Sequence, residues 1–362
     1  MKVAIVYDRV NRWGGAERVL LTLHEMFPDA PLYTSVYDPE LASWAKVFPS
    51  VKPSFLNKIP FTKSHHEWLG TLMPIAFESF RFDDYDFVIS VSSEAAKGII
   101  AKPKTVHICY CLTPTRYLWS HYDEYFKGSI FKAVTKPVVS YLRTWDKIAA
   151  QRPDVMIAIS TEVENRIYKY YKRNSEIIFP PVEVAKFKKQ KDIQKSLPDD
   201  YYLIVSRLRP YKKVDLAISA FNDLELPLVI VGIGNEEEKL KSISKGNIRF
   251  EGLVSDEELV GYYHNAKAFI FPQEEDFGIT PVEAQAMGCP VVAYKKGGAL
   301  DTVIDGETGV FFERQDKYDL MEAVKRIGKI KFDKKKLTKN AEKYSKERFK
   351  MEFLDMLKRN GY

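Results

Sequence analysis

The segment from Glu274 to Ala284 places acidic residues, among them Glu275 and Glu283, around a predicted helix start. It follows a short apolar strand and opens a helix expected over Pro281–Met287. Thr280 suits the N-cap, Pro281 the first helical position and Gly288 the left-handed terminator. The start of a helix presents backbone N–H groups and the positive end of a dipole. The segment therefore predicts an anion site suited to a diphosphate.

Two acids of this segment, Glu275 in the loop and Glu283 on the first helical turn, can face a ligand held there. A carboxylate has two acceptor oxygens and can bind vicinal hydroxyls of a sugar. Other interpretations stay open at this point. Thr280 and Glu283 have the spacing of a capping box, in which the glutamate folds back onto the N-cap amide. Glu275 could equally be a solvated loop acid.

A basic turn follows another predicted strand and contains Arg207 and Lys212. Ligands of open α/β sheets bind outside the carboxyl ends of the strands, so these cations could neutralise a departing diphosphate. Arginine suits bidentate contact with phosphate oxygens, whereas lysine acts as a point charge. A solvated basic turn is the alternative.

Gly14 and Gly15 separate the first predicted strand from the first predicted helix. Adjacent glycines let the backbone approach a phosphate closely, although an ordinary turn before a helix also accounts for them. The G-x-G-x-x-G spacing of a dinucleotide site is missing, which argues against an oxidoreductase.

No set of histidines, cysteines and carboxylates has metal-ligand spacing, so we expect no metal and no other cofactor. Asp84-Tyr85-Asp86 has an acid-x-acid pattern but directly precedes a strand, and we interpret it as a turn. Cys109, Cys111 and Cys289 are odd in number and lack C-x-x-C spacing, which indicates a reducing compartment rather than a disulfide framework.

The elements that must position these residues alternate between apolar strands and amphipathic helices. Helices are expected near Ala16–Met26 and Val214–Phe221, and a last one around Glu342–Leu357. The strands, continuously apolar, are expected at Val3–Tyr7, Phe87–Val91, Val106–Cys111, Val155–Ser160, Tyr202–Ser206, Leu228–Val231, Ala268–Phe271 and Val291–Tyr294. Such runs indicate burial on both faces, and hence parallel sheets between helices in an α/β fold.

Length and composition predict two domains. With 362 residues, the chain exceeds what one core usually serves. A break is expected near Pro180-Pro181 and the polar stretch Lys186–Asp200. We therefore expect an N-terminal domain over 1–185, a C-terminal domain over 186–340 and a terminal helix over 341–362 that packs on either. A cleft between facing domains would collect the candidate residues.

The net charge of +6 suits anionic partners such as phosphates or a membrane surface, and no recognisable nucleic-acid module accompanies it. The apolar start is too short for a signal peptide, and no apolar run reaches the length of a spanning helix. We expect a cytoplasmic protein. Basic and aromatic residues alternate over Phe126–Arg152, as in a helix lying on the inner face of a membrane, although a solvated helix face is the competing interpretation.

Taken together, these segments resemble the retaining GT-B glycosyltransferases of family 4, and within them the WbaZ-like mannosyltransferases of surface-polysaccharide assembly. The resemblance covers nearly the whole chain. Its motifs are the Gly-Gly-x-Glu turn at 14–17, Thr-Pro-x-Arg-Tyr-x-Trp at 113–119, the Arg207 and Lys212 pair, Gly252–Ser255, and Glu275-x7-Glu283 followed by Ala-x-Ala-x-Gly. The last is the most specific.

The resemblance implies a GT-B fold of two facing Rossmann-like domains, in which the N-terminal domain binds the acceptor and the C-terminal domain binds the nucleotide-sugar donor. It also implies a role for each matching position. Glu275 would hold donor-sugar hydroxyls and Glu283 the nucleotide ribose. Arg207 and Lys212 would bind the diphosphate. Substrate-binding roles also fall on Gly14, Gly15, Thr113, Arg116, Leu253, Val254, Phe277, Gly278, Ile279 and Thr280, with the base contacted at Leu253 and Val254 through backbone groups.

One position departs from the family pattern. Many relatives have a histidine where this chain has Leu112, and leucine can neither hydrogen-bond nor titrate. His107 lies within a strand and is no substitute. The expected activity is transfer of mannose from GDP-mannose to a hydroxyl of a lipid-linked glycan, without a metal. A UDP-sugar-dependent transferase and a catalytically impaired nucleotide-sugar-binding subunit are the alternatives. Oligomeric state and acceptor stay open.

Overall fold

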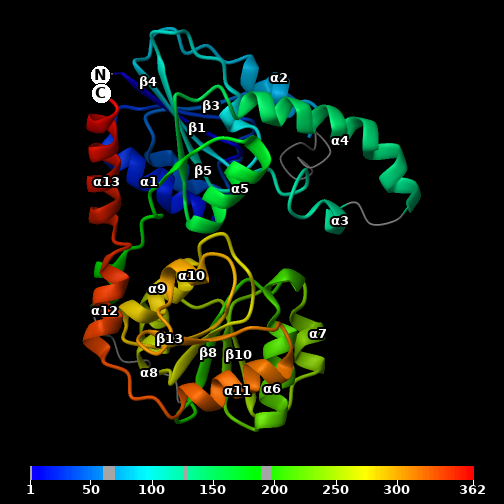
Figure 1. The fold of residues 1–362 in the computed structure, drawn as a ribbon, viewed down its shortest axis with the longest axis vertical. Helices are drawn as coiled ribbons and strands as arrows, with labels where there is room; N and C mark the ends of the chain where they lie inside the picture. The colour runs from blue at the N-terminus through cyan, green and yellow to red at the C-terminus, as the bar shows by residue number, and fades with distance from the viewer. Residues whose placement is uncertain (1, 60–69, 126–128, 189–196) are drawn as a thin grey trace. The chain divides into compact units, whose positions relative to one another are not determined.

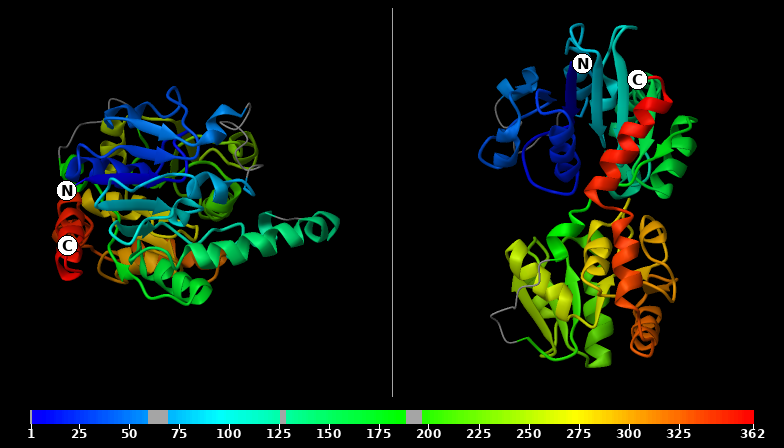
Figure 2. Two further views of the ribbon diagram at one scale, coloured as in Figure 1. Left: turned by 90° about the horizontal axis from the view of Figure 1, so that it is seen from above. Right: turned by 90° about the vertical axis from the view of Figure 1, so that its left-hand side faces the viewer.

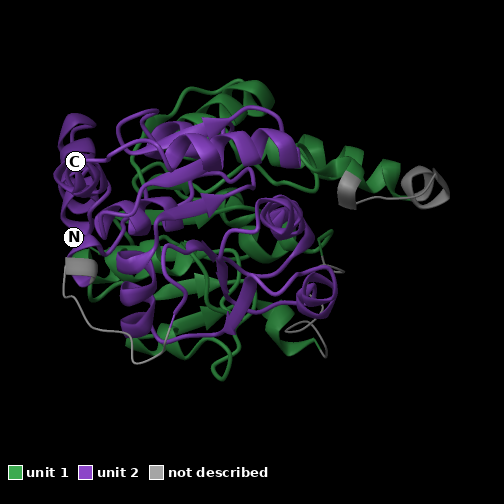
Figure 3. Cartoon of the chain, turned by 90° about the horizontal axis from the view of Figure 1, so that it is seen from below, with its two compact units in different colours: residues 1–179 green, residues 180–362 purple. Residues whose placement is uncertain are grey.

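The computed structural model describes residues 2–59, 70–125, 129–188 and 197–362, with only the backbone given at 124–125, 129–134 and 187–188. Phe126 and Lys127 of the basic, aromatic stretch and residues 189–196 of the expected linker lie outside this description. The chain divides into unit 1, residues 1–179, and unit 2, residues 180–362, coloured separately in Figure 3.

Unit 1 is built on a parallel sheet. Over the described residues, its strands are β1 (Val3–Tyr7), β2 (Leu32–Thr34), β3 (Val51–Pro53), β4 (Phe87–Ser92), β5 (Val106–Cys111), β6 (Val155–Ala158) and β7 (Glu176–Ile177). Their spatial order is β3-β2-β1-β4-β5-β6-β7, and every pairing is parallel. The central strands are buried along their length, as their continuous apolar sequences predict.

The helices of unit 1 are α1 (Ala16–Met26), α2 (Met73–Glu78), α3 (Tyr122–Tyr125), α4 (Ser129–Ala149) and α5 (Thr161–Tyr171), with 3₁₀ turns at Ser43–Val47, Phe55–Lys58 and Ala96–Gly98. Helix α4 extends away from the sheet, as both Figure 1 and Figure 2 show. The part of α4 nearer its C-terminus packs inward through Val139, Leu142 and Asp146.

Unit 2 repeats the design. Over the described residues, its strands are β8 (Tyr202–Val205), β9 (Leu228–Val231), β10 (Ile248–Gly252), β11 (Ala268–Phe271), β12 (Val291–Tyr294) and β13 (Gly309–Phe312). Their spatial order is β10-β9-β8-β11-β12-β13, again with every pairing parallel.

The helices of unit 2 are α6 (Val214–Leu224), α7 (Glu237–Ser242), α8 (Asp256–Asn265), α9 (Ile279–Ala286), α10 (Ala299–Thr302), α11 (Lys317–Ile327), α12 (Lys334–Glu342) and α13 (Lys346–Arg359), with 3₁₀ turns at Val184–Lys188 and Pro210–Lys212. Helices α6 and α11 cover one face of the sheet with a shared apolar core, and α8 and α9 lie on the other face (Figure 1). Helix α8 contributes Tyr263 to that second face, against Phe269 of β11.

The predicted last helix, around Glu342–Leu357, corresponds to α13, which begins four residues later than expected, at Lys346. Helix α12, which was not predicted, ends at Glu342, and the two helices are separated at Lys343–Ser345. Ser345 is the N-cap of α13, and its hydroxyl accepts a hydrogen bond from the amide of Arg348 at 3.2 Å. A serine in this place supplies an acceptor to an otherwise unpaired amide, which favours a new helix start.

Candidate functional site at the carboxyl edge of the second sheet

The candidate residues of unit 2 collect where its strand order reverses. Strands β9 and β10 lie on one side of β8, and β11 to β13 lie on the other. The loops that follow β8 and β11 therefore leave the same edge side by side. In open α/β sheets this reversal is where ligands bind.

Lys212 and Glu275 meet at this reversal. Lys212 ends the 3₁₀ turn after β8, and Glu275 lies in the loop after β11. The Lys212 ammonium is ion-paired with Glu275 Oε1, and the two side chains are 14% and 17% exposed. The ammonium also lies 5.2 Å from the centroid of the Tyr211 ring. A cation and a carboxylate thus lie in contact with limited exposure to solvent. The sequence predicted both residues in loops that follow strands, at the carboxyl edge of the sheet.

The loop that carries Glu275 rests on a pair of glycines after β12. The amide of Gly298 donates to the carbonyl of Glu275 at 2.9 Å. A Cβ atom at Gly297 would lie 2.3 Å from that same carbonyl oxygen, and one at Gly298 would lie 2.2 Å from the Cα of Phe277. Only glycine fits this contact. Neither residue was predicted as part of the site, although two adjacent glycines before a short helix are a visible signal in the sequence.

Helix α9 begins two residues earlier than expected. Gly278 is its N-cap, with φ +89°, and Ile279 is the first helical residue. The prediction of Thr280 as N-cap and Pro281 as first helical residue is therefore wrong. Proline is tolerated at Pro281 because the first amides of a helix have no intrahelical acceptor. Gly288 has φ +74° and terminates the helix as predicted.

The start of α9 keeps the properties of an anion site. No side chain caps Gly278, and its positive φ is open to glycine at little cost. Phe277 is buried and packs edge-on against Tyr344 with ring centroids 5.5 Å apart, so its ring belongs to the core. Gly278, Ile279 and Thr280 are partly exposed and carry the amides that could meet an anion.

Glu283 does not form the capping box with Thr280. It is 1% exposed, and its Oε2 accepts a hydrogen bond from the hydroxyl of Tyr263 at 3.0 Å. A tertiary partner from α8 therefore takes the carboxylate, and the local alternative is wrong. The sequence held no sign of this pairing, since twenty residues separate the two side chains.

The remaining candidates of unit 2 lie on neighbouring loops. Arg207 is exposed after β8, with its guanidinium 3.5 Å from the Tyr211 hydroxyl. Leu253 follows β10 and is 79% exposed, an unusual position for leucine, and Val254 beside it is partly exposed. The amide of Gly232 donates to the carbonyl of Gly252 at 2.7 Å and joins the loops after β9 and β10.

Four candidates lie in unit 1. Gly15 precedes α1 in an ordinary right-handed conformation, so the backbone conformation there does not demand glycine. A Cβ at Gly14 would meet only the end of the Glu17 side chain, at 3.1 Å. Thr113 is buried with no hydrogen-bond partner for its hydroxyl among the described residues, and Arg116 is half-buried.

The motif around Thr113 belongs to a buried polar cluster centred on Asp146 of α4. This carboxylate is fully buried and lies 2.6 Å from the Lys97 ammonium. It also accepts hydrogen bonds from Thr115, Trp119 and Tyr171, at 3.0, 2.7 and 2.8 Å respectively. The cluster joins the segment after β5 to α4 and α5. The motif is visible in the sequence, but its pairing with Asp146 is not.

The basic and aromatic residues of α4 divide between the protein and solvent. Trp145 donates to Glu78 at 2.7 Å, and Arg143 donates to the carbonyl of Leu118 at 2.6 Å. The exposed side chains include Val138, Tyr141 and Ile148. Trp145 and Arg143, which contact the protein, account for part of the alternation of basic and aromatic residues in the sequence. Val138, Tyr141 and Ile148 form an exposed apolar stripe on α4.

The positions of His107, of the three cysteines and of Asp84 agree with the sequence analysis. His107 lies within β5, and burial lowers its pKa to about 3. The three cysteines are free and buried, and burial raises the pKa of Cys109 to about 11. Asp84 lies in a turn before β4. Within the described ranges, no group of three or more potential metal ligands comes together and no helix has the length and apolarity to cross a membrane.

A solved structure matches this chain over nearly its whole length. Anabaena HepE in complex with UDP covers 99% of this chain and 100% of its own, with a TM-score of 0.71 and 16% sequence identity. At this identity the likeness shows the fold, and it confirms the predicted class: the two parallel-sheet α/β units are those of a GT-B protein.

The comparison of sequences is more specific for unit 2. Residues 185–347, which lie within unit 2, match the family model of glycosyl transferases group 1. An uncharacterized glycosyltransferase of Methanocaldococcus jannaschii is 26% identical over 210 residues, which are 57% of this chain and 58% of the relative. The GDP-mannose-dependent alpha-(1-6)-phosphatidylinositol monomannoside mannosyltransferase of Mycolicibacterium smegmatis is 29% identical over 190 residues, 45% of this chain and 50% of the relative. The chain thus spans about half of these relatives.

Proposed function

We propose that the protein is a retaining glycosyltransferase that transfers mannose from GDP-mannose to a hydroxyl of a lipid-linked glycan, without a metal. The observation that carries this proposal is the ion pair of Lys212 with Glu275 beside the uncapped start of α9. It stands in a domain of the glycosyl transferases group 1 family. Mannose as the donor sugar is supported by the GDP-mannose-dependent relative.

The proposed chemistry follows from where charge appears. When the bond between the sugar and the diphosphate breaks, negative charge develops on the departing diphosphate. Lys212, Arg207 and the amides from Gly278 to Thr280 would stabilise that charge. Preorganised groups of this kind contribute about 3–4 kcal/mol each by mutation. Glu275 would bind the sugar hydroxyls once the nucleotide sugar takes over contact with the lysine.

A panel of nucleotides tests the donor. GDP, UDP, ADP and their sugars are added singly, and the melting temperature is recorded, because a ligand that binds only the native state raises it. GDP compounds are expected to give the largest rise. A rise with UDP compounds alone would replace GDP-mannose by a UDP-sugar. This second candidate is favoured by HepE, whose structure holds UDP.

Substitution of Lys212 tests the site. Lys212→Ala is expected to lower the rate of donor turnover, measured as nucleotide release, by on the order of a hundredfold or more. Lys325→Ala is the matched control, because Lys325 forms an exposed ion pair with Glu322 at 2.8 Å on α11 of the same unit. Equal rates in Lys212→Ala and wild type would remove the lysine from the reaction. Absence of turnover of every donor by the wild type would instead support a catalytically impaired nucleotide-sugar-binding subunit, the alternative that Leu112 favours.

We also propose that the acceptor is met at a membrane surface. The support is the exposed stripe of Val138, Tyr141 and Ile148 on α4, with Lys136 and Lys147 exposed on the same helix. Apolar side chains beside lysines suit the boundary of an anionic bilayer. Sedimentation with phosphatidylglycerol vesicles tests this, and protein left entirely in the supernatant would contradict it.

A further inference from the structure

Unit 2 carries a cluster of exposed lysines on and before helix α12. The stretch of residues 329–343 contains seven lysines and two acids, a net charge of +5, whereas the whole chain has +6. Nearly all of the net charge therefore comes from this short stretch. Its seven lysines are all exposed and are called the lysine surface: Lys329, Lys331, Lys334, Lys335, Lys336, Lys339 and Lys343.

Helix α12 holds these lysines on a fixed support. Its inner side carries the buried Asn340, which donates to the side chain of Gln285 on α9 at 2.8 Å and to the carbonyl of Thr302 at 2.9 Å (Figure 1). Lys335 and Lys339 are spaced four residues apart, so they lie one above the other on the outer side of the helix. The charges are thus presented to solvent from a helix that is anchored to its neighbours.

The lysine surface is little neutralised by acids of the protein. Asp333 is the N-cap of α12, and its carboxylate accepts a hydrogen bond from the amide of Lys335 at 2.9 Å. Within the described residues, Lys336 is the one lysine of this surface in an ion pair, with Glu307 at 3.7 Å. Most of the positive charge is therefore left facing solvent.

The arrangement of the lysines works against the helix that carries them. Lys334, Lys335 and Lys336 are the first three residues of α12, where the positive end of the helix dipole disfavours cations. The first turn of α12 contains no acid, whereas the first turns of α8, α11 and α13 each contain one or more. Lys335 and Lys339 also repel each other across one turn. An unfavourable local arrangement of this kind is expected where a partner supplies the compensating charge.

We propose that the lysine surface binds the anionic headgroups of a membrane, by charge and without insertion. An anionic leaflet attracts clustered lysines, and no large apolar side chain of residues 329–343 is exposed. The stretch has no arginine, whose planar fork suits the phosphates of nucleic acids. Its one aromatic residue, Phe332, packs against the core of unit 2 and offers no surface for stacking a base. A membrane is thus favoured over a nucleic acid.

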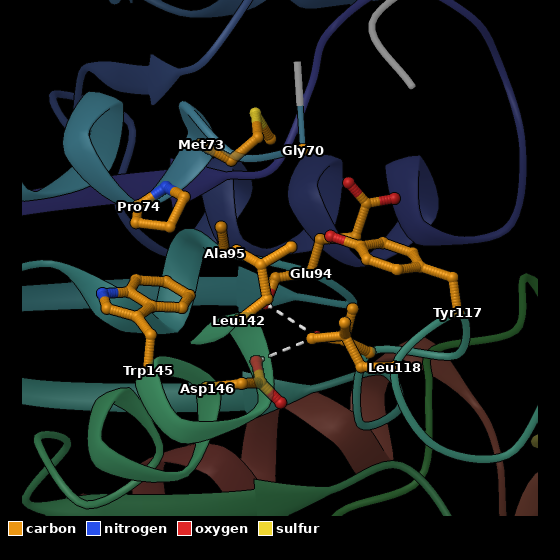
Figure 4. Close-up of a pocket in the computed structure, with 11 residues that line it drawn as sticks. Gly70, Met73, Pro74, Glu94, Ala95, Tyr117, Leu118, Leu142, Trp145 and Asp146 are labelled. Atoms are coloured by element: carbon orange, nitrogen blue, oxygen red, sulfur yellow. Dashed lines mark hydrogen bonds between the residues drawn. The ribbon is translucent and has the colours of Figure 1, made fainter. Parts of the chain in front are cut away.

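This contact goes beyond the one proposed for α4 and does not require it. The surface of α4 is an apolar stripe, and the one acid of α4, Asp146, is turned into the protein, where it accepts a hydrogen bond from Thr115 at 3.0 Å (Figure 4). The two surfaces differ in their expected response to salt. Added salt screens exposed charges, so it should weaken the contact made by the lysine surface and affect an apolar contact little.

Sedimentation with vesicles of phosphatidylcholine and phosphatidylglycerol in equal parts tests the proposal. The variant combines three lysines that have no ion pair within the described residues: Lys331→Gln, Lys335→Gln and Lys339→Gln. Each lysine near an anionic leaflet strengthens binding about fivefold, so this variant is expected to bind about a hundredfold more weakly at about 0.1 M salt. The matched control removes the same charge from three paired lysines of unit 2 and should bind almost as well as wild type: Lys239→Gln, Lys241→Gln and Lys295→Gln.

Melting temperatures without vesicles distinguish a binding role from a structural one. The lysine variant is expected to melt no lower than wild type, because it loses charges that oppose the helix dipole. A lower melting temperature together with weaker vesicle binding would assign these lysines to the fold and overturn the proposal. Failure of GDP to raise the melting temperature of wild type would count against the donor proposed above and not against this surface.

Other results would also overturn the proposal. These are equal loss of vesicle binding in the lysine variant and the control, or wild-type binding that is unchanged at about 0.5 M salt. Loss of binding in Tyr141→Ser with none in the lysine variant would place the membrane contact on α4 alone. Weaker binding of the lysine variant to a single-stranded oligonucleotide, with vesicle binding unchanged, would make this a nucleic-acid surface instead.

Discussion

Replacing Gly298 by alanine should damage the donor site without unfolding unit 2. The added Cβ would lie 2.2 Å from the Cα of Phe277, and ordinary contacts begin at 3.4 Å. The two segments must therefore separate by about 1.2 Å, the difference of these distances. Neither side can give way by rotating a side chain, since the contact on Phe277 is backbone. The displaced segment is the one that holds Glu275 against Lys212 and leads into α9.

The size of the effect follows from that displacement. Misplacing a reacting group by about 1 Å can lower a rate by about a hundredfold. We therefore expect kcat/KM for the donor to fall by about that factor in Gly298→Ala. Overpacking costs about 1–3 kcal/mol of stability, which is less than the 5–15 kcal/mol of a typical domain. The variant should fold.

The assay combines initial rates of nucleotide release with urea unfolding of the same preparations. Gly246→Ala is the control, because its added Cβ would meet nothing within 4 Å. It should keep wild-type rates. A folded Gly298→Ala protein with unchanged kcat/KM would refute the argument that this glycine positions the Glu275 loop. Loss of rate that only follows the fraction unfolded would refute it as well.

Two further outcomes are expected. Burial lowers the pKa of His107 to about 3. In the unfolded chain the imidazole has an ordinary pKa near 6.5, so between these two values it is protonated in the unfolded chain and neutral in the native state. The contribution of His107 to the free energy of unfolding is fully present above about pH 6.5. It falls on acidification, by about 2 kcal/mol at pH 5. Urea unfolding at pH 7 and pH 5 should show a smaller difference for His107→Gln than for wild type, and equal differences would contradict this. Tyr141→Ser on α4 should weaken sedimentation with phosphatidylglycerol vesicles several-fold. Tyr168→Ser, at a 59% exposed tyrosine on α5, should not, and equal loss in both would contradict a specific role for α4.

The strands that sequence predicted well are the buried central ones. Val3–Tyr7, Val106–Cys111 and Leu228–Val231 have the predicted bounds, because a strand buried on both faces must be continuously apolar. Strands such as β2 and β7 were missed, since two or three residues cannot display a pattern. Strand β10 was missed because its polar and apolar residues alternate at a sheet edge, with Arg249 exposed.

The candidate site divides along a similar line. Residues in the loops that follow neighbouring strands, such as Lys212 after β8 and Glu275 after β11, could be brought together from topology alone. Contacts between distant segments could not. The spacing of Thr280 and Glu283 is a local signal for a capping box. In the structure Glu283 instead accepts a hydrogen bond from Tyr263, because a buried carboxylate requires a partner and this distant residue supplies one. The contact of Gly298 with Phe277 likewise needs the folded backbone.

A charge pair recurs where the strand order reverses in each unit, Lys212 with Glu275 in unit 2 and Arg9 with Glu94 in unit 1. This recurrence has a topological reason. Where strand order reverses, successive crossovers leave in opposite directions, and the strand ends between them are not covered by their own helices. Charged side chains placed there remain partly hydrated, while the surrounding low dielectric strengthens their mutual attraction. Exposures of 14–17% at all four side chains fit that compromise. A polar ligand that displaces the remaining water finds groups already charged and positioned.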